Sequence, residues 1–362
     1  MKRVWTLRLC AVVLCAALLG GCAASGGSAA ESRAPADPLT GQQLLYPGER
    51  TAAVVIENRA DSTTQWGIGS ASVVLEALTE AQASTSLCLV YPSLGAMPVV
   101  GPVTQGQDLY WRLLYGQQVL PIQCGSGVYA KNYLEYYNLR AVDALEVGRN
   151  AFTCDETWSN TPLWRTSGKA VQEVLSSLGI SAEASLTDGA ASSSDADEEA
   201  AAAVLPGLLP QQEEEHLPDA NAADAVQVTV NFQSGSATGF AYNADLQTYG
   251  MLHADGTPQL DANTGTQAAF DNLLILYSSS SLRDDETTLD YDLTMGGGIW
   301  LNGGHLWHIT WTQGTDTSLA FYDANGRPLT IKAGRSYIAL LSSLTGQELT
   351  VQNSAGESLL AE

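Results

Sequence analysis

The chain has 362 residues, with 16 Lys and Arg against 39 Asp and Glu, so its formal net charge is −23. This excess of negative charge opposes binding to nucleic acid or to an anionic lipid surface, because both require clustered basic residues. Apolar residues make up 45% of the chain, which is enough material for two cores of ordinary domain size. We therefore expect two folded domains and no nucleic acid partner.

Residues 1–21 are typical of a secretory signal. They begin with Lys2 and Arg3, and the run from Leu9 to Leu19 carries no charge. A helix that crosses a hydrocarbon layer of ~30 Å needs about 20 apolar residues, so this run is too short to span it. The sequence predicts a segment that is removed on export.

The signal ends in Leu19-Gly20-Gly21-Cys22, the arrangement that bacterial lipoprotein signals place around their cleavage site. It predicts cleavage before Cys22 and lipidation of its thiol. Two acyl chains anchor a protein stably, since each buried methylene contributes roughly 0.8 kcal/mol. We expect a lipid anchor at the extracytoplasmic face of the cell membrane. An ordinary secretory signal that a cysteine happens to follow is the alternative.

After the signal, changes in composition divide the chain into four segments. Small and polar residues suggest a flexible lipidated tether first, and an acidic low-complexity linker without Lys or Arg separates two folded regions. The expected segments are the tether 22–38, an α/β domain 39–180, the linker 181–224 and a β-rich domain 225–362.

In the first folded region, apolar runs alternate with stretches of helical period. Strands are expected at Ala52–Ile56, Ser86–Tyr91, Val119–Gln123 and Val142–Val147, and helices at Ala71–Ala81, Asp108–Tyr115, Tyr129–Tyr137 and Ala170–Leu178. Such alternation favours an α/β layer with a largely parallel sheet.

The last third contains short β-branched or aromatic runs that turn residues separate. Strands are expected at Val226–Phe232, Leu273–Tyr277, Gly298–Leu301, Leu306–Trp311, Ser318–Tyr322 and Ser336–Leu341. Asn302-Gly303 is a favourable hairpin turn, because both residues tolerate a positive φ. The fold class is therefore α+β, with the mainly β domain at the C-terminus.

Several short motifs resemble the YerB-like bacterial lipoproteins, in the same order. They are Asp37–Gly41, Val54–Asn58, Val74–Leu78, Gly101–Val103, Asn302-Gly303 with Ile309–Trp311, Phe321–Gly326 and Gly334–Ile338. The resemblance covers nearly all of the chain beyond the tether. It implies a two-domain lipoprotein, but it supplies no mechanism, because the family has no assigned activity.

The chain departs from this family at residues that would carry chemistry. Thr104 and Gln107 stand where relatives usually have two arginines, Glu57 replaces an aspartate, Gln123 a histidine, and Pro162-Leu163-Trp164 a Pro-His-Asn step. Arg offers a planar bidentate donor to carboxylate or phosphate, which neither Thr nor Gln can replace. An anion site built on that pair is not expected here.

Ligands of an open parallel sheet bind beyond the carboxyl ends of its strands, which predicts one crevice. Its expected lining is Glu57, Asn58, Gly101, Cys124, Gly125, Ser126, Gly127 and Lys131. The glycines could let backbone N–H groups meet an anion with Lys131 nearby, although such a turn more often serves chain geometry.

An enzymatic role needs a base beside a nucleophile, and none of the four histidines falls in the α/β region. A carboxylate pair of Glu57 and Glu76 stays open, as does a disulfide between Cys124 and Cys154. Acidic residues 284–292 lack the glycine and ligand order of a calcium loop, so a solvated hairpin tip is favoured. We expect no metal ion and no cofactor.

The sequence thus favours a non-catalytic envelope lipoprotein that acts as a binding or scaffold module for cell-wall material or an envelope protein. The alternative is an envelope hydrolase or transferase that uses a crevice around Glu57 and Cys124.

Overall fold

The computed structural model describes most of the chain beyond the predicted tether. The described residues are 36–59, 64–81, 84–154, 157–158, 161–184, 207–212, 223–233, 236–314, 318–342, 344 and 346–360. The predicted signal, Cys22 and most of the predicted tether and linker lie outside them. Among the described residues, no helix is both long and apolar enough to cross a membrane.

A mixed sheet of fourteen described strands combines the two regions that the sequence analysis separates. Its central order is β22-β21-β20-β19-β16-β24-β2-β3-β1-β4-β9, with β5, β6 and β11 attached beside this path. The strands are β1 (Ala52–Glu57), β2 (Val73–Ala77), β3 (Ser86–Tyr91), β4 (Val99–Val103), β5 (Leu120–Gln123), β6 (Val142–Asp143), β9 (Trp164–Ser167), β11 (Ala223–Asp224), β16 (Asn272–Ser278), β19 (Met295–Asn302), β20 (His305–Gln313), β21 (Leu319–Tyr322), β22 (Pro328–Leu329) and β24 (Ser336–Ser342).

A second sheet of five described strands belongs to the C-terminal half alone, in the order β15-β14-β13-β12-β25. Its strands are β12 (Gln227–Gln233), β13 (Ser236–Asn243), β14 (Thr248–Leu252), β15 (Ala269–Phe270) and β25 (Glu348–Gln352). Three short pairs complete the β structure of the described part of the chain, namely β7 (Thr157–Trp158) with β8 (Thr161–Pro162), β10 (Gln211–Gln212) with β23 (Ile331–Lys332), and β17 (Ser280–Leu282) with β18 (Leu289–Tyr291).

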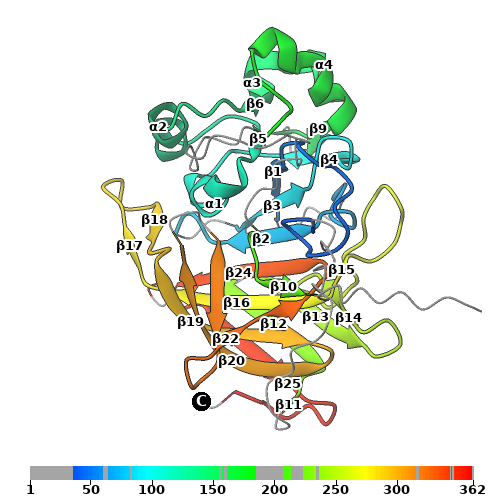
Figure 1. Cartoon of the computed structure of the whole chain (residues 1–362), viewed down its shortest axis with the longest axis vertical. Coiled ribbons are helices and arrows are strands. Elements are labelled where there is room, and N and C mark those ends of the chain that lie inside the picture. The colour runs from blue at the N-terminus through cyan, green and yellow to red at the C-terminus, as the bar shows by residue number, and fades with distance from the viewer. Residues whose placement is uncertain are drawn as a thin grey trace, which may run out of the picture. The chain divides into compact units, whose positions relative to one another are not determined.

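The α-helices of the described residues lie in the N-terminal half, where Figure 1 shows them at the end of the main sheet that β1, β4 and β5 form. They are α1 (Asp108–Leu113), α2 (Val128–Tyr136), α3 (Ala144–Val147) and α4 (Gly168–Leu178). Ser167 caps α4, because its hydroxyl accepts a hydrogen bond from the N–H of Ala170, and Gly179 ends the helix in the left-handed conformation.

The α+β class is confirmed, but the expectation of a largely parallel sheet is wrong. Strand β1 runs antiparallel to β3 and β4, and β2 runs antiparallel to β3. The parallel pairs are β1 with β5, β5 with β6, β2 with β24, and β16 with β24. A parallel pair needs a long crossover, whereas antiparallel neighbours can follow one another directly, as β2 and β3 do here.

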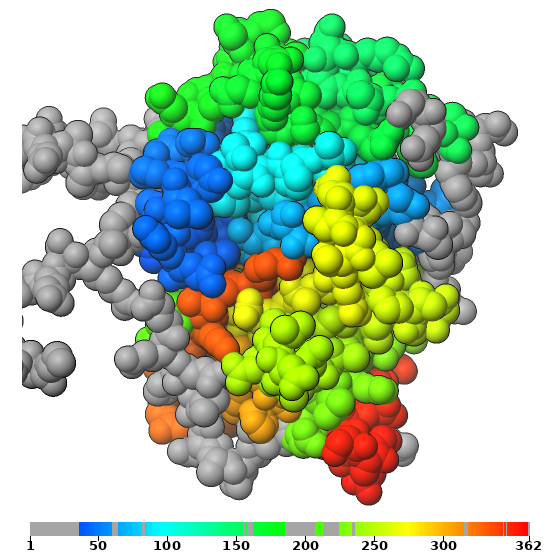
Figure 2. Space-filling view, turned by 90° about the vertical axis from the view of Figure 1, so that its right-hand side faces the viewer, coloured from blue at the N-terminus to red at the C-terminus, as the bar shows by residue number. Residues whose placement is uncertain are grey.

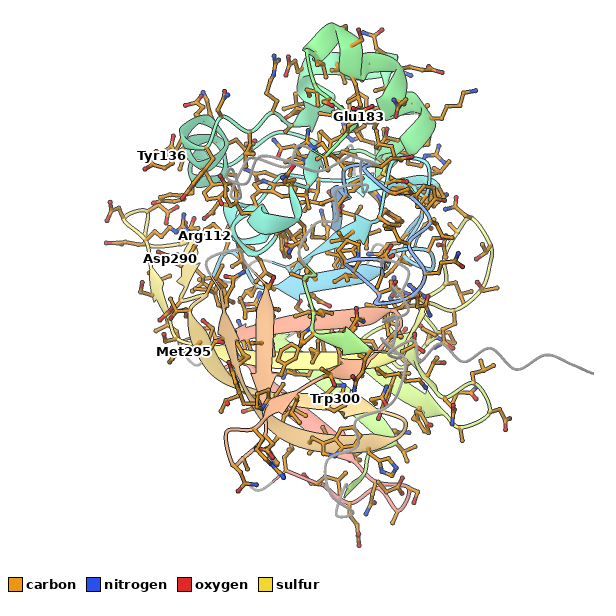
Figure 3. All side chains as sticks on the ribbon, viewed as in Figure 1. Arg112, Tyr136, Glu183, Asp290, Met295 and Trp300 are labelled. Atoms are coloured by element: carbon orange, nitrogen blue, oxygen red, sulfur yellow. The ribbon has the colours of Figure 1, made fainter. Side chains whose placement is uncertain are left out.

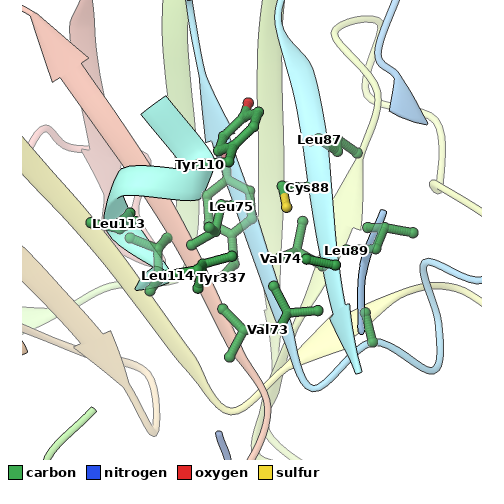
Figure 4. Packing of buried hydrophobic residues seen from close by; sticks show 14 of the residues in the cluster. Val73, Val74, Leu75, Leu87, Cys88, Leu89, Tyr110, Leu113, Leu114 and Tyr337 are labelled. Carbon is green, nitrogen blue, oxygen red and sulfur yellow. The ribbon is translucent and has the colours of Figure 1, made fainter. Parts of the chain in front are cut away.

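The helix expected at Ala71–Ala81 is also wrong, since Val73–Ala77 forms the central strand β2. All five residues of β2 are buried, because β3 and β24 flank the strand and other side chains cover both of its faces. Figure 4 shows Val73, Val74 and Leu75 packed near Cys88 and Tyr337. A strand buried on both faces loses the alternation that would distinguish it from a helix.

The strand expected at Val142–Val147 is correct only for its first two residues. Strand β6 ends at Asp143, whose carboxylate accepts the Leu145 N–H at 2.9 Å and so caps the short helix α3. An aspartate at this position favours a helix start over strand continuation.

The other expected elements match in type and approximate position, including all six C-terminal strands. The sequence does not indicate strands β13, β14 and β25, because the polar and glycine residues within them resemble loops. The domain boundaries stay a prediction, although β2 and β24 pair directly across them. Of the predicted linker, only 181–184, 207–212 and 223–224 are described, and Leu208 and Leu209 there are buried.

The half-buried Arg335 and the buried Asp261 join the halves by hydrogen bonds to backbone groups. Arg335 donates to the carbonyl oxygens of Ile68, Ala71 and Ala269 at 2.8, 2.8 and 2.6 Å. The carboxylate of Asp261 accepts the N–H groups of Gly67 and Gly69 at 3.2 and 2.8 Å. Figure 2 shows the yellow segment that includes residues near 261 against the blue and cyan N-terminal segments.

Arg335→Met should lower the free energy of unfolding by about 3–5 kcal/mol, because it leaves three carbonyl groups without their donor in a buried place. Urea unfolding followed by tryptophan fluorescence measures this loss. The exposed Arg327, which pairs with Asp323 at 2.7 Å, provides a matched control. Arg327→Met should cost less than about 1 kcal/mol. Equal losses in both variants would contradict the role given to Arg335.

Candidate functional site

A polar cleft lies at the end of β1, and one part of it is lined by residues of the C-terminal half. It consists of two hollows of about 170 Å³ each that share Asn58 and Arg59, and we call both together the polar cleft. One hollow is further lined by Ser236, Ala237, Thr238, Leu252, His253, Ala254, Asp255, Thr257 and Gln259. The other is lined by Glu57, Thr79, Glu80, Ser84, Thr85, Ser86, Thr104, Gln105 and Gln107.

The fully buried carboxyl group of Glu76 lies behind the lining of this cleft. Its Oε1 accepts hydrogen bonds from Asn58 Nδ2 at 2.8 Å and from Thr85 Oγ1 at 2.6 Å. Its Oε2 accepts from Thr238 Oγ1 at 2.8 Å and from the Tyr337 hydroxyl at 2.7 Å. Both oxygens are therefore satisfied by neutral donors, as a buried polar group requires.

The same network fixes the side chains that face the cleft. The second N–H of the Asn58 amide donates to Thr85 Oγ1 at 2.9 Å, and Gln65 Nε2 donates to the Glu57 carbonyl oxygen at 2.6 Å. Burial raises the pKa of Glu76, while the hydrogen bonds from its four partners oppose the rise. A perturbed buried carboxyl group beside a cleft is a typical feature of a functional site.

The structure separates the predicted crevice residues into groups. Glu57 and Asn58 line the polar cleft, as expected for residues at the end of a strand. Gly101 instead lies inside β4, where a Cβ atom would come within 2.7 Å of the Trp164 carbonyl oxygen, so its glycine serves packing. Lys131 is exposed on α2 and pairs with Glu135 at 3.9 Å.

The glycine turn before α2 already holds a carboxylate. The Gly125 N–H donates to Asp143 Oδ1 at 2.9 Å, and Gln123 Nε2 donates to Asp143 Oδ2 at 3.0 Å. The Ser126 hydroxyl accepts a hydrogen bond from the same Gln123 amide. Gly125 has a φ of +79°, which explains the glycine by chain geometry. An aspartate of the chain itself thus occupies the position that an anion would take.

Cys124 follows β5 and is half-buried beside this turn. Burial raises the pKa of its thiol to about 11, with further contributions from Asp143, Cys154 and Glu57. The influence of Glu57 places these two predicted residues within electrostatic reach of each other. A thiol with this pKa is protonated near neutral pH and is therefore a weak nucleophile. The three described cysteines, Cys88, Cys124 and Cys154, are free.

The acidic residues 284–292 serve local structure. Asp285 accepts hydrogen bonds from the Thr288 hydroxyl and from the N–H groups of Thr288 and Thr287 at 2.6, 2.8 and 3.0 Å. These hydrogen bonds, that of the Thr288 hydroxyl foremost, lower the pKa of Asp285 to about 2. Asp290 forms ion pairs with Arg112 and Arg283 at 2.7 and 3.1 Å. Within the described ranges, no group of three or more His, Cys, Asp or Glu could hold a metal ion.

Thr85, Thr238 and Tyr337 could not be identified from the sequence, because no local motif marks them. They lie 9, 162 and 261 positions from Glu76 and meet it only after β2 pairs with its neighbours. A glutamate inside an apolar run, as in Val73-Val74-Leu75-Glu76-Ala77, is the one signal that could have indicated the network. Such a residue needs buried partners.

Comparison with known proteins identifies one family along the chain. Residues 39–185 match the N-terminal domain of a "Protein of unknown function (DUF3048)", and residues 228–338 match the C-terminal domain of the same family. A Bacillus subtilis (strain 168) protein named "Putative lipoprotein YerB" is 24% identical over 305 residues, which cover 82% of this chain and 81% of that relative. The YerB-like resemblance is thereby confirmed.

The fold has a counterpart of known structure. The crystal structure of YerB protein from Bacillus subtilis superposes with a TM-score of 0.70 at 21% sequence identity. The match covers 87% of this chain and 99% of the other. It supports the α+β arrangement of strands described above.

Glu76→Gln should remove a pH dependence of stability. Because burial raises the pKa of Glu76, the native state binds its proton more tightly than the unfolded state does. The stabilising contribution is complete below the unfolded pKa of about 4.3 and is lost as pH rises through the folded pKa. The free energy of unfolding of the native sequence minus that of Glu76→Gln should therefore fall as pH increases above about 4.

Urea titrations at a series of pH values measure this difference. Glu183→Gln removes a carboxylate near the surface and controls for the change in net charge. A difference that stays flat or increases with pH would show that Glu76 does not have a raised pKa.

Proposed function

The chain belongs to the DUF3048 family, and from this premise we propose that it is a membrane-anchored lipoprotein of the bacterial cell envelope whose polar cleft binds cell-wall material or another envelope protein. Two independent features support the location. One is the signal that ends in Leu19-Gly20-Gly21-Cys22, and the other is similarity to a relative whose name describes a lipoprotein.

The polar cleft is the observation that carries the binding role. Its walls are formed mainly by amide and hydroxyl side chains, with Gln105, Gln107 and Thr104 on one side. The buried Glu76 orients Asn58 and Thr85 at its floor, so part of the lining is fixed before a ligand arrives. A preorganised polar lining lowers the entropic cost of binding and suits a ligand that forms hydrogen bonds.

The rival hydrolase or transferase has less support. Its nucleophile would be Cys124, whose pKa of about 11 keeps the thiol protonated near neutral pH. His253 lines the other hollow of the polar cleft, and burial lowers the pKa of its imidazole. No described contact joins His253 to Cys124, so the geometry supplies no pair of nucleophile and base.

Cys22→Ala should move the chain out of the membrane fraction, because it removes the thiol that would carry the acyl chains. Immunoblotting of membrane and soluble fractions measures the distribution. Cys88→Ala, which changes a buried cysteine, is the matched control and should stay with the membrane. Equal membrane recovery of both variants would exclude lipid anchoring through Cys22.

The binding role is tested by co-sedimentation of the detergent-solubilised chain with purified cell-wall sacculi. Gln105→Ala combined with Gln107→Ala removes two amide groups from the cleft and should weaken binding about tenfold. Gln227→Ala, on the exposed face of β12, controls for the loss of an amide. Failure of the native chain to sediment with sacculi would contradict cell-wall binding, and equal sedimentation of all variants would exclude the cleft.

A further inference from the structure

Four tyrosine rings gather where the end of α2 meets the turn after α1, and we call them the tyrosine platform: Tyr115, Tyr133, Tyr136 and Tyr137. Three of these rings are exposed and that of Tyr133 is half-buried. The ring centroids of Tyr133 and Tyr115 lie 4.6 and 4.8 Å from that of Tyr137, and Tyr136 packs edge-on to Tyr137 at 4.8 Å. Tyr136 is 82% exposed. Rings clustered at the surface in this way mark a binding surface more often than an isolated exposed ring does.

A charged hollow of about 530 Å³ lies at the foot of the platform, between α1, the start of α2 and the β17–β18 hairpin. Arg112 pairs with Asp290 at 2.7 Å, and Arg283 pairs with Asp108 at 2.6 Å. Figure 3 shows Arg112 and Asp290 below Tyr136 on the same side of the molecule. Each cation in the hollow is thus matched by a carboxylate.

The platform and the hollow are physically continuous. Tyr129 and Tyr133 are one helical turn apart, and the guanidinium of Arg283 lies over the Tyr129 ring at 4.3 Å. Burial raises the pKa of the Tyr133 hydroxyl. Among its neighbours, Tyr137, Tyr115 and Asp108 raise this pKa further, and Arg112 lowers it. Tyr133 therefore connects the aromatic rings to the ion pairs.

The hollow is also next to the polar cleft. Gln107 lines the cleft and precedes the first residue of α1, Asp108, which lines the hollow. Glu80, on the cleft wall, forms a bridge to Thr288 beside strand β18. The polar cleft, the charged hollow and the tyrosine platform therefore lie one after another. Surfaces in such a row can contact an extended ligand along its length better than a compact one.

The chemistry of these surfaces restricts the ligand. Arg283 and Arg112 already form ion pairs with Asp108 and Asp290. The net charge of −23 also repels an anionic polymer. Paired Arg and Asp offer neutral hydroxyl groups both donors and acceptors, while tyrosine rings offer flat apolar faces with a polar tip. The exposed pair of Lys131 and Glu135 beside the rings argues against a dry protein interface.

We propose that the tyrosine platform and the charged hollow bind a linear, uncharged glycan, whose sugar rings stack on the tyrosines and whose hydroxyls bond the ion pairs. This inference rests on the proposed function, since it names glycan as the part of the cell wall that is recognised. It assigns to α2 and the β17–β18 hairpin a role separate from that of the Glu76 network.

Calorimetric titration of the detergent-solubilised chain with a β-1,4-linked N-acetylglucosamine hexamer tests this site. The native chain should bind the hexamer, and Tyr137→Ser should weaken binding roughly 2- to 12-fold through loss of one stacked ring. Tyr136→Ser combined with Tyr137→Ser should weaken it further. Leu246→Ser, at a residue 69% exposed in the loop before β14, is the matched control and should bind as the native chain does.

Urea midpoints of the variants show whether each is folded, which the high exposure of Tyr136 favours. No heat with the native chain at millimolar hexamer, or equal binding by the tyrosine and control variants, would overturn the proposal. If the native chain still sediments with sacculi in that case, the proposed function survives without this site. A photocrosslinker at Tyr136 that captures protein and not glycan on intact cells would likewise overturn it.

Discussion

The carboxyl group of Glu76 is buried away from water on β2, the strand where the two halves of the chain meet. Strand β2 pairs with β3 from the N-terminal half and with β24 from the C-terminal half. Two donors to Glu76, Asn58 and Thr85, come from the first half, and Thr238 and Tyr337 come from the second. Burying this group without all its partners would cost several kcal/mol, so the arrangement requires both halves together.

The position of the cleft follows from that constraint. Thr238 belongs to the five-stranded sheet, and its bond to Glu76 holds that sheet against the main one beside Asn58. Arg335 and Asp261 add further links between the halves by satisfying backbone groups of residues 67–71. The side chains on either side of Asn58 therefore have fixed positions, although they come from segments far apart in the sequence.

Much of the fold could be predicted from local patterns, because most strands are bounded by turn residues and α4 has a clear cap and stop. The pattern failed at β2, where burial on both faces hides the period of a strand, and at Asp143, where one side chain ends a strand and begins a helix. Whether neighbouring strands run parallel or antiparallel could not be predicted either. The parallel pairs of β24 with β2 and β16 depend on contacts between distant segments that no local motif encodes.

The candidate site could be predicted in part. Glu57 and Asn58 were found from their position after a buried strand, and they line the cleft. The glycine turn was a weaker guide, because sequence alone does not show that Asp143 fills it.

Hydrogen exchange of the amides of β2 and β24 tests most directly the claim that the halves form one cooperative unit through Glu76. Both strands should open with the same free energy, and Glu76→Gln should lower that free energy equally in both. Loss of protection in β2 alone, with β24 unchanged, would contradict it.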